Sequence, residues 1–203
     1  MLSTIVSLPT SSFPPIALGF MGLGTGYLIY GTQELFDFPK RNADVDAATG
    51  VWGIWLPGFC QFVTGVFLFL GLVFGTFTAK PLYMAALAFS AYGIHWFAMG
   101  WNRLKGRSEP RVNFGMAIGF LAISVLGASV FLGAHDTPVA LVFIGLVLVY
   151  ISDVFATLKP NLPGLGAFGE RSLGLFHLLT GIWLIYMMFG VTLDFALGYH
   201  WWI

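Results

Sequence analysis

The chain has 203 residues, of which 58% are hydrophobic and only 9% are charged, with a mean hydropathy of +0.85. Globular chains carry roughly 25% charged residues, so this composition excludes a soluble domain, and the apolar content excludes a disordered chain. Nine Lys and Arg balance nine Asp and Glu, which leaves no basic surface for a nucleic acid. The single cysteine, Cys60, excludes an internal disulfide framework and a cysteine-based zinc site.

Six apolar stretches are long enough to cross a bilayer, whose core of about 30 Å needs roughly 20 helical residues. Turn and charge clusters separate them, notably Asp37–Gly50, Arg103–Arg111 and Lys159–Gly169. The sequence therefore predicts an all-α membrane protein, with one six-helix transmembrane domain over residues 1–203, of which 1–15 form an N-terminal segment. The predicted spans are about Ile16–Phe36, Val51–Thr76, Pro81–Asn102, Val112–Gly133, Pro138–Leu158 and Leu173–Tyr199.

The distribution of positive charge predicts an orientation. If the Arg103–Arg111 segment is cytoplasmic, alternation of the helices leaves only Lys80 of the nine Lys and Arg residues outside. Membrane proteins concentrate Lys and Arg in cytoplasmic loops, so this bias places both termini outside. The residues on the inner side are Lys40, Arg41, Arg103, Lys105, Arg107, Arg111, Lys159 and Arg171.

No Lys or Arg falls deep in any predicted helix. An anion crossing here therefore lacks a bidentate Arg clamp and must rely on hydroxyls, amides, helix ends or a neutral, protonated form. Polar side chains inside a membrane either face a cavity or hold helices together, and both interpretations stay open. The candidates are Thr25, Gln61, Thr64, Ser90, Tyr92, His95, Ser124, Ser129, Ser152, Asp153, His177 and Thr180.

Helical spacing sorts the candidates into faces. In the first span Leu23 is the one large side chain on a glycine-rich face, where glycines allow close helix contact or leave room beside a pore. In the second span Pro57 lacks a backbone donor and is expected to kink the helix. The predicted faces are Gly19, Gly22, Leu23 and Gly26; Pro57, Gln61, Thr64 and Leu68; Phe89, Tyr92 and Trp96; Leu146 and Asp153; and His177, Gly181, Leu184 and Met188.

Glycine pairs four residues apart recur at Gly22–Gly26, Gly71–Gly75 and Gly115–Gly119. Small residues at this spacing allow the backbones of membrane helices to approach closely. We therefore expect a tightly packed bundle or an oligomer.

Three titratable residues fall within the predicted spans, namely His95, Asp153 and His177. They are candidates for proton-linked transport, although Asp153 lies near the Lys159 end of its helix, where hydration alone would account for it. One His per helix does not form a metal-binding pair, and the motifs of hydrolases, metalloproteases and phosphate loops are absent. We expect no enzyme activity, no catalytic residues, no metal and no cofactor.

Short motifs occur in a fixed order along the helices. The first span opens with PIALGFMG over Pro15–Gly22, and the second carries Gly-Ile followed by GFCQ and a glycine within Gly53–Gly65. The third contains AFSAYGIHW over Ala88–Trp96. The last two carry Val-Phe before Leu146 and a Gly…Ile-Tyr…Gly run over Gly181–Gly190. In this order the set resembles the acetate uptake transporter family (AceTr), the succinate–acetate permeases.

The resemblance implies a six-helix protomer, assembled as a homo-hexamer, with a separate substrate path through each subunit. It implies an apolar constriction formed by residues of the first, third and fifth helices, here Leu23, Tyr92 and Leu146. Gln61 and Leu184 approach the same path. Thr25 and Phe89, from the polar candidates and the aromatic face, complete the expected path residues.

Some positions depart from the family pattern. Pro14 stands where the family has Asn, and Ala17 stands where it has a second Pro, which alters the expected entry site. Leu23 replaces Phe at the constriction and is expected to widen it. Leu184 occupies a position that is small in the family and is expected to narrow the passage for larger dicarboxylates.

We therefore expect membrane transport of acetate and related short-chain monocarboxylates, with succinate as a further candidate, by a channel-like or proton-coupled route. The hydroxyl of Tyr92 would meet the carboxyl group of the substrate. Two alternatives remain open: a channel for another small neutral solute such as ammonium or water, and a non-transporting scaffold subunit.

The expected surroundings are the lipid bilayer, of the plasma or inner membrane, and further copies of the chain, with no nucleic acid. The resemblance implies cytoplasmic termini, which disagrees with the charge bias, and the sequence leaves the orientation open.

Overall fold

A computed structural model describes residues 15–107 and 110–203 of the chain. The predicted N-terminal segment, apart from Pro15, lies outside the described residues, and so does the substituted Pro14. The side chain of Arg111, one of the nine Lys and Arg residues used to predict the orientation, also lies outside the described residues.

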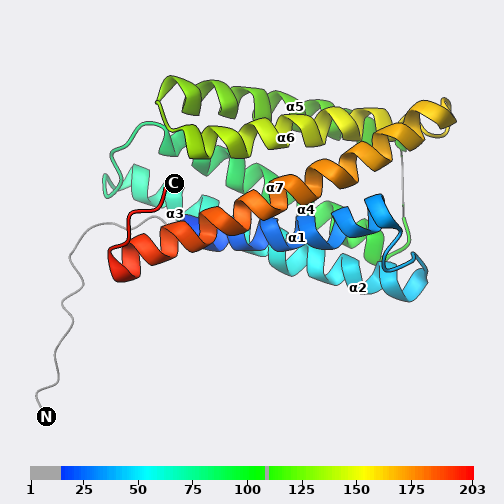
Figure 1. The fold of residues 1–203 in the computed structure, drawn as a ribbon, viewed down its shortest axis with the longest axis horizontal. Coiled ribbons are helices and arrows are strands. Elements are labelled where there is room, and N and C mark those ends of the chain that lie inside the picture. The colour runs from blue at the N-terminus through cyan, green and yellow to red at the C-terminus, as the bar shows by residue number, and fades with distance from the viewer. Residues whose placement is uncertain (1–14, 108–109) are drawn as a thin grey trace, which may run out of the picture.

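The described residues fold into long helices, as predicted. They are α1 (Ile16–Phe36), α2 (Ala43–Gly53), the π-helical segment η1 (Ile54–Cys60), α3 (Gln61–Val73), α4 (Leu82–Leu104), α5 (Pro110–Gly133), α6 (Thr137–Ala156) and α7 (Pro163–Leu197). α2, η1 and α3 follow without interruption and form one helical run, so the chain contains the six predicted helical spans (Figure 1).

Five of these six runs are long and apolar enough to cross a membrane, and the chain is a multi-pass integral membrane protein. α1 is the exception. Its 21 residues are rich in glycine and also hold Tyr, Thr and Gln, which lower its hydropathy. About half of them are buried, because α1 lies between α7 on one side and η1 and α3 on the other. A helix surrounded by protein does not need a fully apolar surface.

Two predicted boundaries were wrong, because helix extends into segments that the sequence indicated as separators. The second span begins at Ala43 instead of Val51, where the Asn42 side chain accepts a hydrogen bond from the Val45 amide at 2.9 Å. Such a cap satisfies a free amide at the start of a helix. The last helix begins at Pro163 instead of Leu173, because proline fits the first turn, where no amide donor is needed.

Close backbone contact holds α1 in the centre of the bundle. A Cβ atom on Gly26 would lie 2.7 Å from the ring of Pro57, and one on Gly22 would collide with the Leu56 carbonyl oxygen. On the other side of α1, a Cβ on Gly31 would lie 2.9 Å from the carbonyl oxygen of Gly174 in α7. Of the two interpretations of these glycines, the structure therefore favours close contact over space beside a pore.

Pro57 is accommodated by a change of helix type. It lies within the π-helical segment η1, between α2 and α3. Proline cannot donate a backbone hydrogen bond, and in an α-helix its ring collides with the carbonyl four residues earlier. A π-helical turn bonds to the fifth residue instead and widens the backbone at this point.

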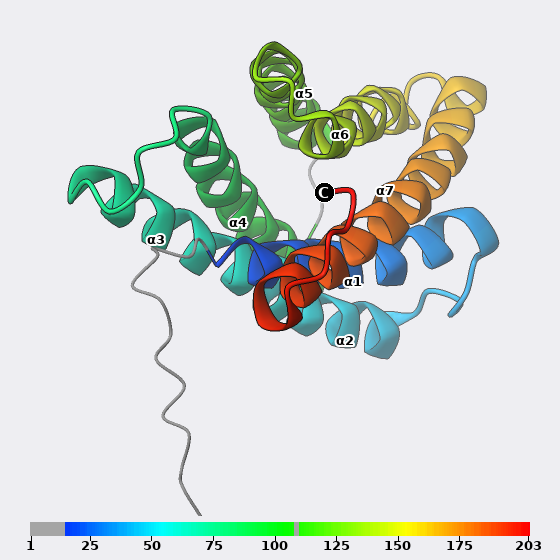
Figure 2. The ribbon, with the colours of Figure 1, turned by 60° about the vertical axis from the view of Figure 1, so that its left-hand side comes forward.

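The helices follow one another around a ring (Figure 2). α5 packs on α6, α6 on α7 and α7 on α1, and α1 contacts η1 and α3, which pack on α4. The contact between α4 and α5, which closes the ring, is much smaller. Pro15 and the C-terminus lie at the same end of the bundle, as an even number of crossings requires (Figure 1).

Only one of the three predicted glycine pairs joins two helices within the described part of the protomer. Gly22–Gly26 packs against η1, whereas Gly71 contacts the ring of Phe77 in the following loop. Gly115 and Gly119 lie on an exposed face of α5, where a methyl group added to either residue would meet no described atom within 4 Å.

The α3–α4 contact provides a test of this packing. A Cβ on Gly93 would lie 2.6 Å from the Phe62 backbone nitrogen, so Gly93→Ala must push the two backbones apart. We expect it to destabilise the fold by about 1–3 kcal/mol, as other overpacked substitutions do. The unfolding temperature of the purified protein in detergent measures this effect. Gly164→Ala is the control, because its new methyl group meets open space. Equal unfolding temperatures for the two variants would contradict the packing described.

Candidate substrate path

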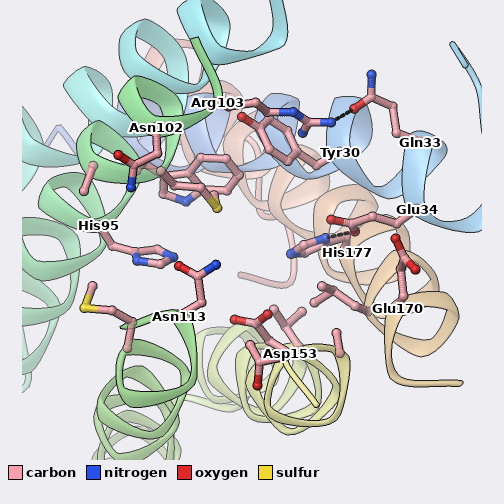
Figure 3. Close-up of a pocket in the computed structure, with 18 of the residues that line it drawn as sticks. Tyr30, Gln33, Glu34, His95, Asn102, Arg103, Asn113, Asp153, Glu170 and His177 are labelled. Atoms are coloured by element: carbon pink, nitrogen blue, oxygen red, sulfur yellow. Dashed lines mark hydrogen bonds and ion pairs between the residues drawn. The ribbon is translucent and has the colours of Figure 1, made fainter. Parts of the chain in front are cut away.

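A cavity of about 600 Å³ opens at the end of the bundle opposite Pro15 (Figure 3). It is surrounded by the C-terminal ends of α1, α4 and α6 and by the N-terminal ends of α2, α5 and α7. The polar and charged residues that line it are Tyr27, Tyr30, Gln33, Glu34, Arg41, Asp46, His95, Asn102, Arg103, Arg107, Asn113, Tyr150, Asp153, Thr157, Lys159, Glu170 and His177.

Ion pairs fix the outer part of this cavity. Arg41 donates to Asp46 at 3.0 Å, and Lys159 pairs with Glu170. The hydrogen bond to Asp46 raises the pKa of the Arg41 guanidinium above its usual value. Arg103 and Arg107 also line the cavity, so four of the cations predicted to share one side of the membrane lie around a single opening.

Arg103 lies in the last turn of α4 instead of the predicted loop, and its side chain is only 12% exposed. Its guanidinium donates to Asp46 at 3.1 Å and to the side-chain oxygen of Gln33, and it lies 4.4 Å from the centre of the Tyr30 ring. Arg103 therefore ties α4 to α1 and α2. It is eleven residues from Tyr92, about 16 Å along the helix, and so lies well away from the predicted constriction.

An ion pair between α1 and α7 lies deeper in the cavity. The Nδ1 atom of His177 is 2.6 Å from Oε2 of Glu34, and the His177 side chain is 8% exposed (Figure 3). The ring of Tyr27 packs against the imidazole at a tilt of 38°, with 4.3 Å between ring centres. These contacts hold the histidine in one orientation toward the carboxylate.

Asp153 and His95 line the same cavity from α6 and α4 (Figure 3). The carboxylate of Asp153 has no hydrogen bond or ion pair within the described chain. The imidazole of His95 packs on the rings of Phe120, at 4.5 Å, and Tyr150, at 6.1 Å. The structure thus gathers the three predicted titratable residues around one space, and their part in proton transfer stays a prediction.

Beyond the cavity, the three residues predicted to form the constriction are buried among apolar side chains. Leu23, Tyr92 and Leu146 are 3%, 3% and 2% exposed and belong to one hydrophobic cluster. They come from α1, α4 and α6, the first, third and fifth of the six helical runs. The resemblance assigned the constriction to these three helices, and the structure buries all three side chains.

One hydroxyl pair lies in this apolar layer. The Tyr92 oxygen is 2.9 Å from the Ser124 hydroxyl, which donates to the Phe120 carbonyl oxygen at 2.7 Å. A serine hydroxyl has one hydrogen, so Tyr92 must donate the bond that it shares with Ser124. The Tyr92 oxygen therefore keeps a free lone pair and acts toward any passing molecule as an acceptor.

The other predicted path residues occupy different surroundings. Gln61 and Leu184 are fully buried, and neither polar atom of the Gln61 amide has a hydrogen-bond partner among the described residues. Phe89 fills the space over Gly19 of α1. Thr25 is two residues from Leu23, about 200° around the helix, and its hydroxyl contacts the Met21 sulfur at 3.9 Å. The structure therefore does not bring Thr25 to the face of Leu23.

Most polar residues of the cavity were not predicted as site residues from the sequence, among them Gln33, Glu34, Asp46 and Arg103. Two of them continue faces that were already evident. Glu34 follows Leu23, Tyr27 and Tyr30 at helical spacing, and Arg103 is eleven residues after Tyr92, at three turns of the same helix. Neither Glu34 nor Arg103 was predicted, because the predicted helical faces included only residues in the apolar part of each helix and stopped before its polar end.

Comparison with known proteins supports the fold. No family model matches the sequence, and no curated protein sequence matches it. One solved structure that does match is that of the bacterial acetate channel SatP, with a TM-score of 0.68 and 19% sequence identity, covering 92% of this chain and 96% of that one. The chain therefore has the fold of this channel, and the resemblance inferred from the motifs is confirmed at the level of the fold.

The Arg103 cluster provides a test of the cavity wall. Arg103→Lys keeps the charge but cannot reach Asp46, Gln33 and the Tyr30 face together, because an ammonium lacks the planar fork of a guanidinium. We expect a loss of about 1–3 kcal/mol in stability, measured as a lower unfolding temperature in detergent. Lys105→Gln is the control, because Lys105 is exposed and its ammonium group lies over the exposed ring of Trp101, outside the Arg103 contacts. An unfolding temperature of Arg103→Lys equal to that of the wild type would show that the cluster does not stabilise the fold.

Proposed function

We propose that this protein conducts acetate and similar short-chain monocarboxylates across a membrane, through a path within each protomer. The proposal is supported by the fold, which is that of an acetate channel, and by a wide polar cavity that ends at a buried apolar layer. Leu23, Tyr92 and Leu146 form the gate in this layer, and the cavity is the entrance to it.

The observation that carries the proposal is the hydrogen bonding of Tyr92. An acetate anion needs hydrogen-bond donors, whereas Tyr92 donates its only hydrogen to Ser124 and offers an acceptor. A neutral carboxylic acid carries an O–H group that can donate to this oxygen. The gate therefore matches the protonated acid better than the anion.

The apolar surroundings favour the same form of the substrate. Moving an unpaired charge through a layer of buried leucine side chains costs several kcal/mol or more, and no basic side chain lies at this layer within the described residues. The neutral acid avoids this cost. Transport thus carries a proton together with each carboxylate, whether the protein acts as a channel or as a symporter.

Gln61 and Leu184 extend the path in this proposal. The Gln61 amide is buried without a partner among the described residues, which is unfavourable unless water or substrate binds it. Leu184 fills space beside the path with a large, fully buried side chain and so disfavours longer acids such as succinate.

We also propose that the protomers assemble as a homo-hexamer. The outer faces of α3 and α5 are apolar, and the exposed Gly115–Gly119 pair on α5 has the spacing that lets another helix approach closely. These faces leave the cavity inside each protomer free.

Uptake of labelled acetate into proteoliposomes of the purified protein tests the proposed function. We expect uptake above that of empty vesicles, competed by propionate and increased by an inward proton gradient. Uptake that instead follows ammonium or osmotic gradients would indicate a channel for another small solute. Absence of any flux in a folded, reconstituted sample would indicate a scaffold.

Tyr92→Phe tests the gate in the same assay. The change removes the acceptor oxygen, while Ser124 keeps its bond to the Phe120 carbonyl oxygen, so no buried donor is left unpaired. Since one neutral hydrogen bond contributes about 0.5–1.5 kcal/mol, we expect acetate flux to fall roughly threefold to tenfold. Tyr83→Phe is the control, because Tyr83 is 63% exposed on the same helix. Unchanged flux in Tyr92→Phe would remove Tyr92 from the mechanism.

The double substitution of Leu23 and Leu146 by Ala tests size selection. Removing both side chains from the layer opens space for larger acids, so we expect succinate uptake to rise relative to acetate uptake. Leu148→Ala is the control, because this residue is 38% exposed on another face of α6. If the double variant still excluded succinate, these two leucines would not form the gate.

A further inference from the structure

The side chains along the proposed path differ in kind at three successive depths between the opening and the gate. The rim is rich in cations, with Arg41, Arg107 and Lys159 around the mouth of the cavity. The next level contains histidines and carboxylates, and the last is the apolar layer. The faces of the helices produce this order, because Tyr27 and Tyr30 separate Glu34 from Leu23 on α1, and Tyr150 separates Asp153 from Leu146 on α6.

The middle level, here named the histidine–carboxylate layer, consists of Glu34, His95, Asp153 and His177 (Figure 3). The Glu34 carboxylate lies 2.6 Å from the His177 imidazole and so has a hydrogen-bond partner. Asp153 has no such partner among the described side chains, so its negative charge is unpaired when it is ionised. Protonation of Asp153 removes that negative charge.

This charge opposes a carboxylate anion at the point where the anion must lose its charge. The cationic rim attracts the anion, but an ionised Asp153 repels it. A protonated Asp153 removes the repulsion and holds a proton next to the space that the anion enters. One proton and one anion thus occupy the layer together more readily than the anion alone.

We propose that the histidine–carboxylate layer is a proton-exchange site, at which Asp153 converts an incoming carboxylate anion into the neutral acid that passes the gate. This inference rests on the proposed function. In the exchange, the O–H bond of the Asp153 carboxyl group breaks and an O–H bond forms on the substrate carboxylate. The electron pair of the broken bond stays on Asp153, which regains a proton from water in the cavity.

The Glu34–His177 pair is a positioning element in this proposal. Its carboxylate and imidazole face the Asp153 side of the cavity from α1 and α7, and contact with the Tyr27 ring fixes the imidazole. Other charged or titratable side chains line the same cavity from α1, α2, α4, α6, α7 and the adjoining loops. They are Tyr27 and Tyr30 of α1, Arg41 before α2, Asp46 of α2, His95 and Arg103 of α4, Arg107 after α4, Tyr150 of α6, Lys159 after α6 and Glu170 of α7.

The pH profile of acetate uptake distinguishes this site from simple passage of acid already neutral in solution. Above the pKa of a carboxylic acid, about 4–5, the concentration of the neutral form falls about tenfold per pH unit. If only the neutral acid enters the protein, acetate uptake also falls about tenfold per pH unit. If Asp153 supplies the proton, the anion is the arriving species, and uptake falls less steeply over that part of the range from about pH 5 to pH 8 in which the Asp153 carboxyl group is still protonated.

The experiment measures initial acetate uptake into proteoliposomes over this pH range, with the uptake of empty vesicles subtracted. We expect a shallow profile for the wild type and a slope of about tenfold per pH unit for Asp153→Asn, with at least a tenfold loss of uptake near pH 7. Glu34→Gln is expected to shift the profile in the same direction by a smaller amount. Asp153→Glu keeps a carboxyl group and is expected to retain the shallow profile.

Asp44→Asn is the matched control, because Asp44 is an exposed carboxylate of α2 that does not line the cavity. Its profile is expected to match that of the wild type. A wild-type slope of tenfold per pH unit, or an Asp153→Asn profile equal to the wild type, would overturn the exchange site while leaving acetate transport established. Absence of wild-type uptake at every pH would overturn the proposed function and this inference together.

Discussion

The close packing of α1 between η1 and α7 is the constraint on which the rest of the structure depends. Glycines on two sides of α1 bring its backbone against the Leu56 carbonyl and the Pro57 ring, and against the carbonyl of Gly174. This contact fixes the rotation of α1 about its axis. The face that remains, from Leu23 through Tyr27 to Glu34, is therefore directed toward the path.

The same face carries different chemistry at different depths. An α-helix rises 1.5 Å per residue, so side chains three or four residues apart share a face at successive depths. α1 and α6 both run from a buried leucine through a tyrosine to a carboxylate, and α4 runs from Tyr92 through His95 to Arg103. A substrate would meet cations first, then titratable groups, then an apolar layer. In the proposed function, this order would let the protein attract an anion and still pass only a neutral acid.

Much of this protein was predictable from local patterns. The membrane class, the all-α fold and the number of helical runs follow from hydropathy and length, because crossing a bilayer requires about 20 apolar residues with satisfied backbone hydrogen bonds. α1 has the predicted bounds, Ile16–Phe36. The starts of α2 and α7 were not predictable in this way, because the Asn42 cap and Pro163 in a first turn begin those helices before the apolar core.

The sequence by itself determined which residues share a helical face, because the period of the helix is fixed by the backbone. The motif resemblance added Leu23, Tyr92 and Leu146 as the expected constriction, and the position of the three titratable residues within apolar spans made them candidates. Only the tertiary structure decided which faces meet. The Glu34–His177 pair joins residues 143 positions apart, and Arg103 reaches Asp46 and Gln33 across three helical segments. Such contacts depend on the rotation and spacing of packed helices, which the α1 glycines and the Pro57 turn set.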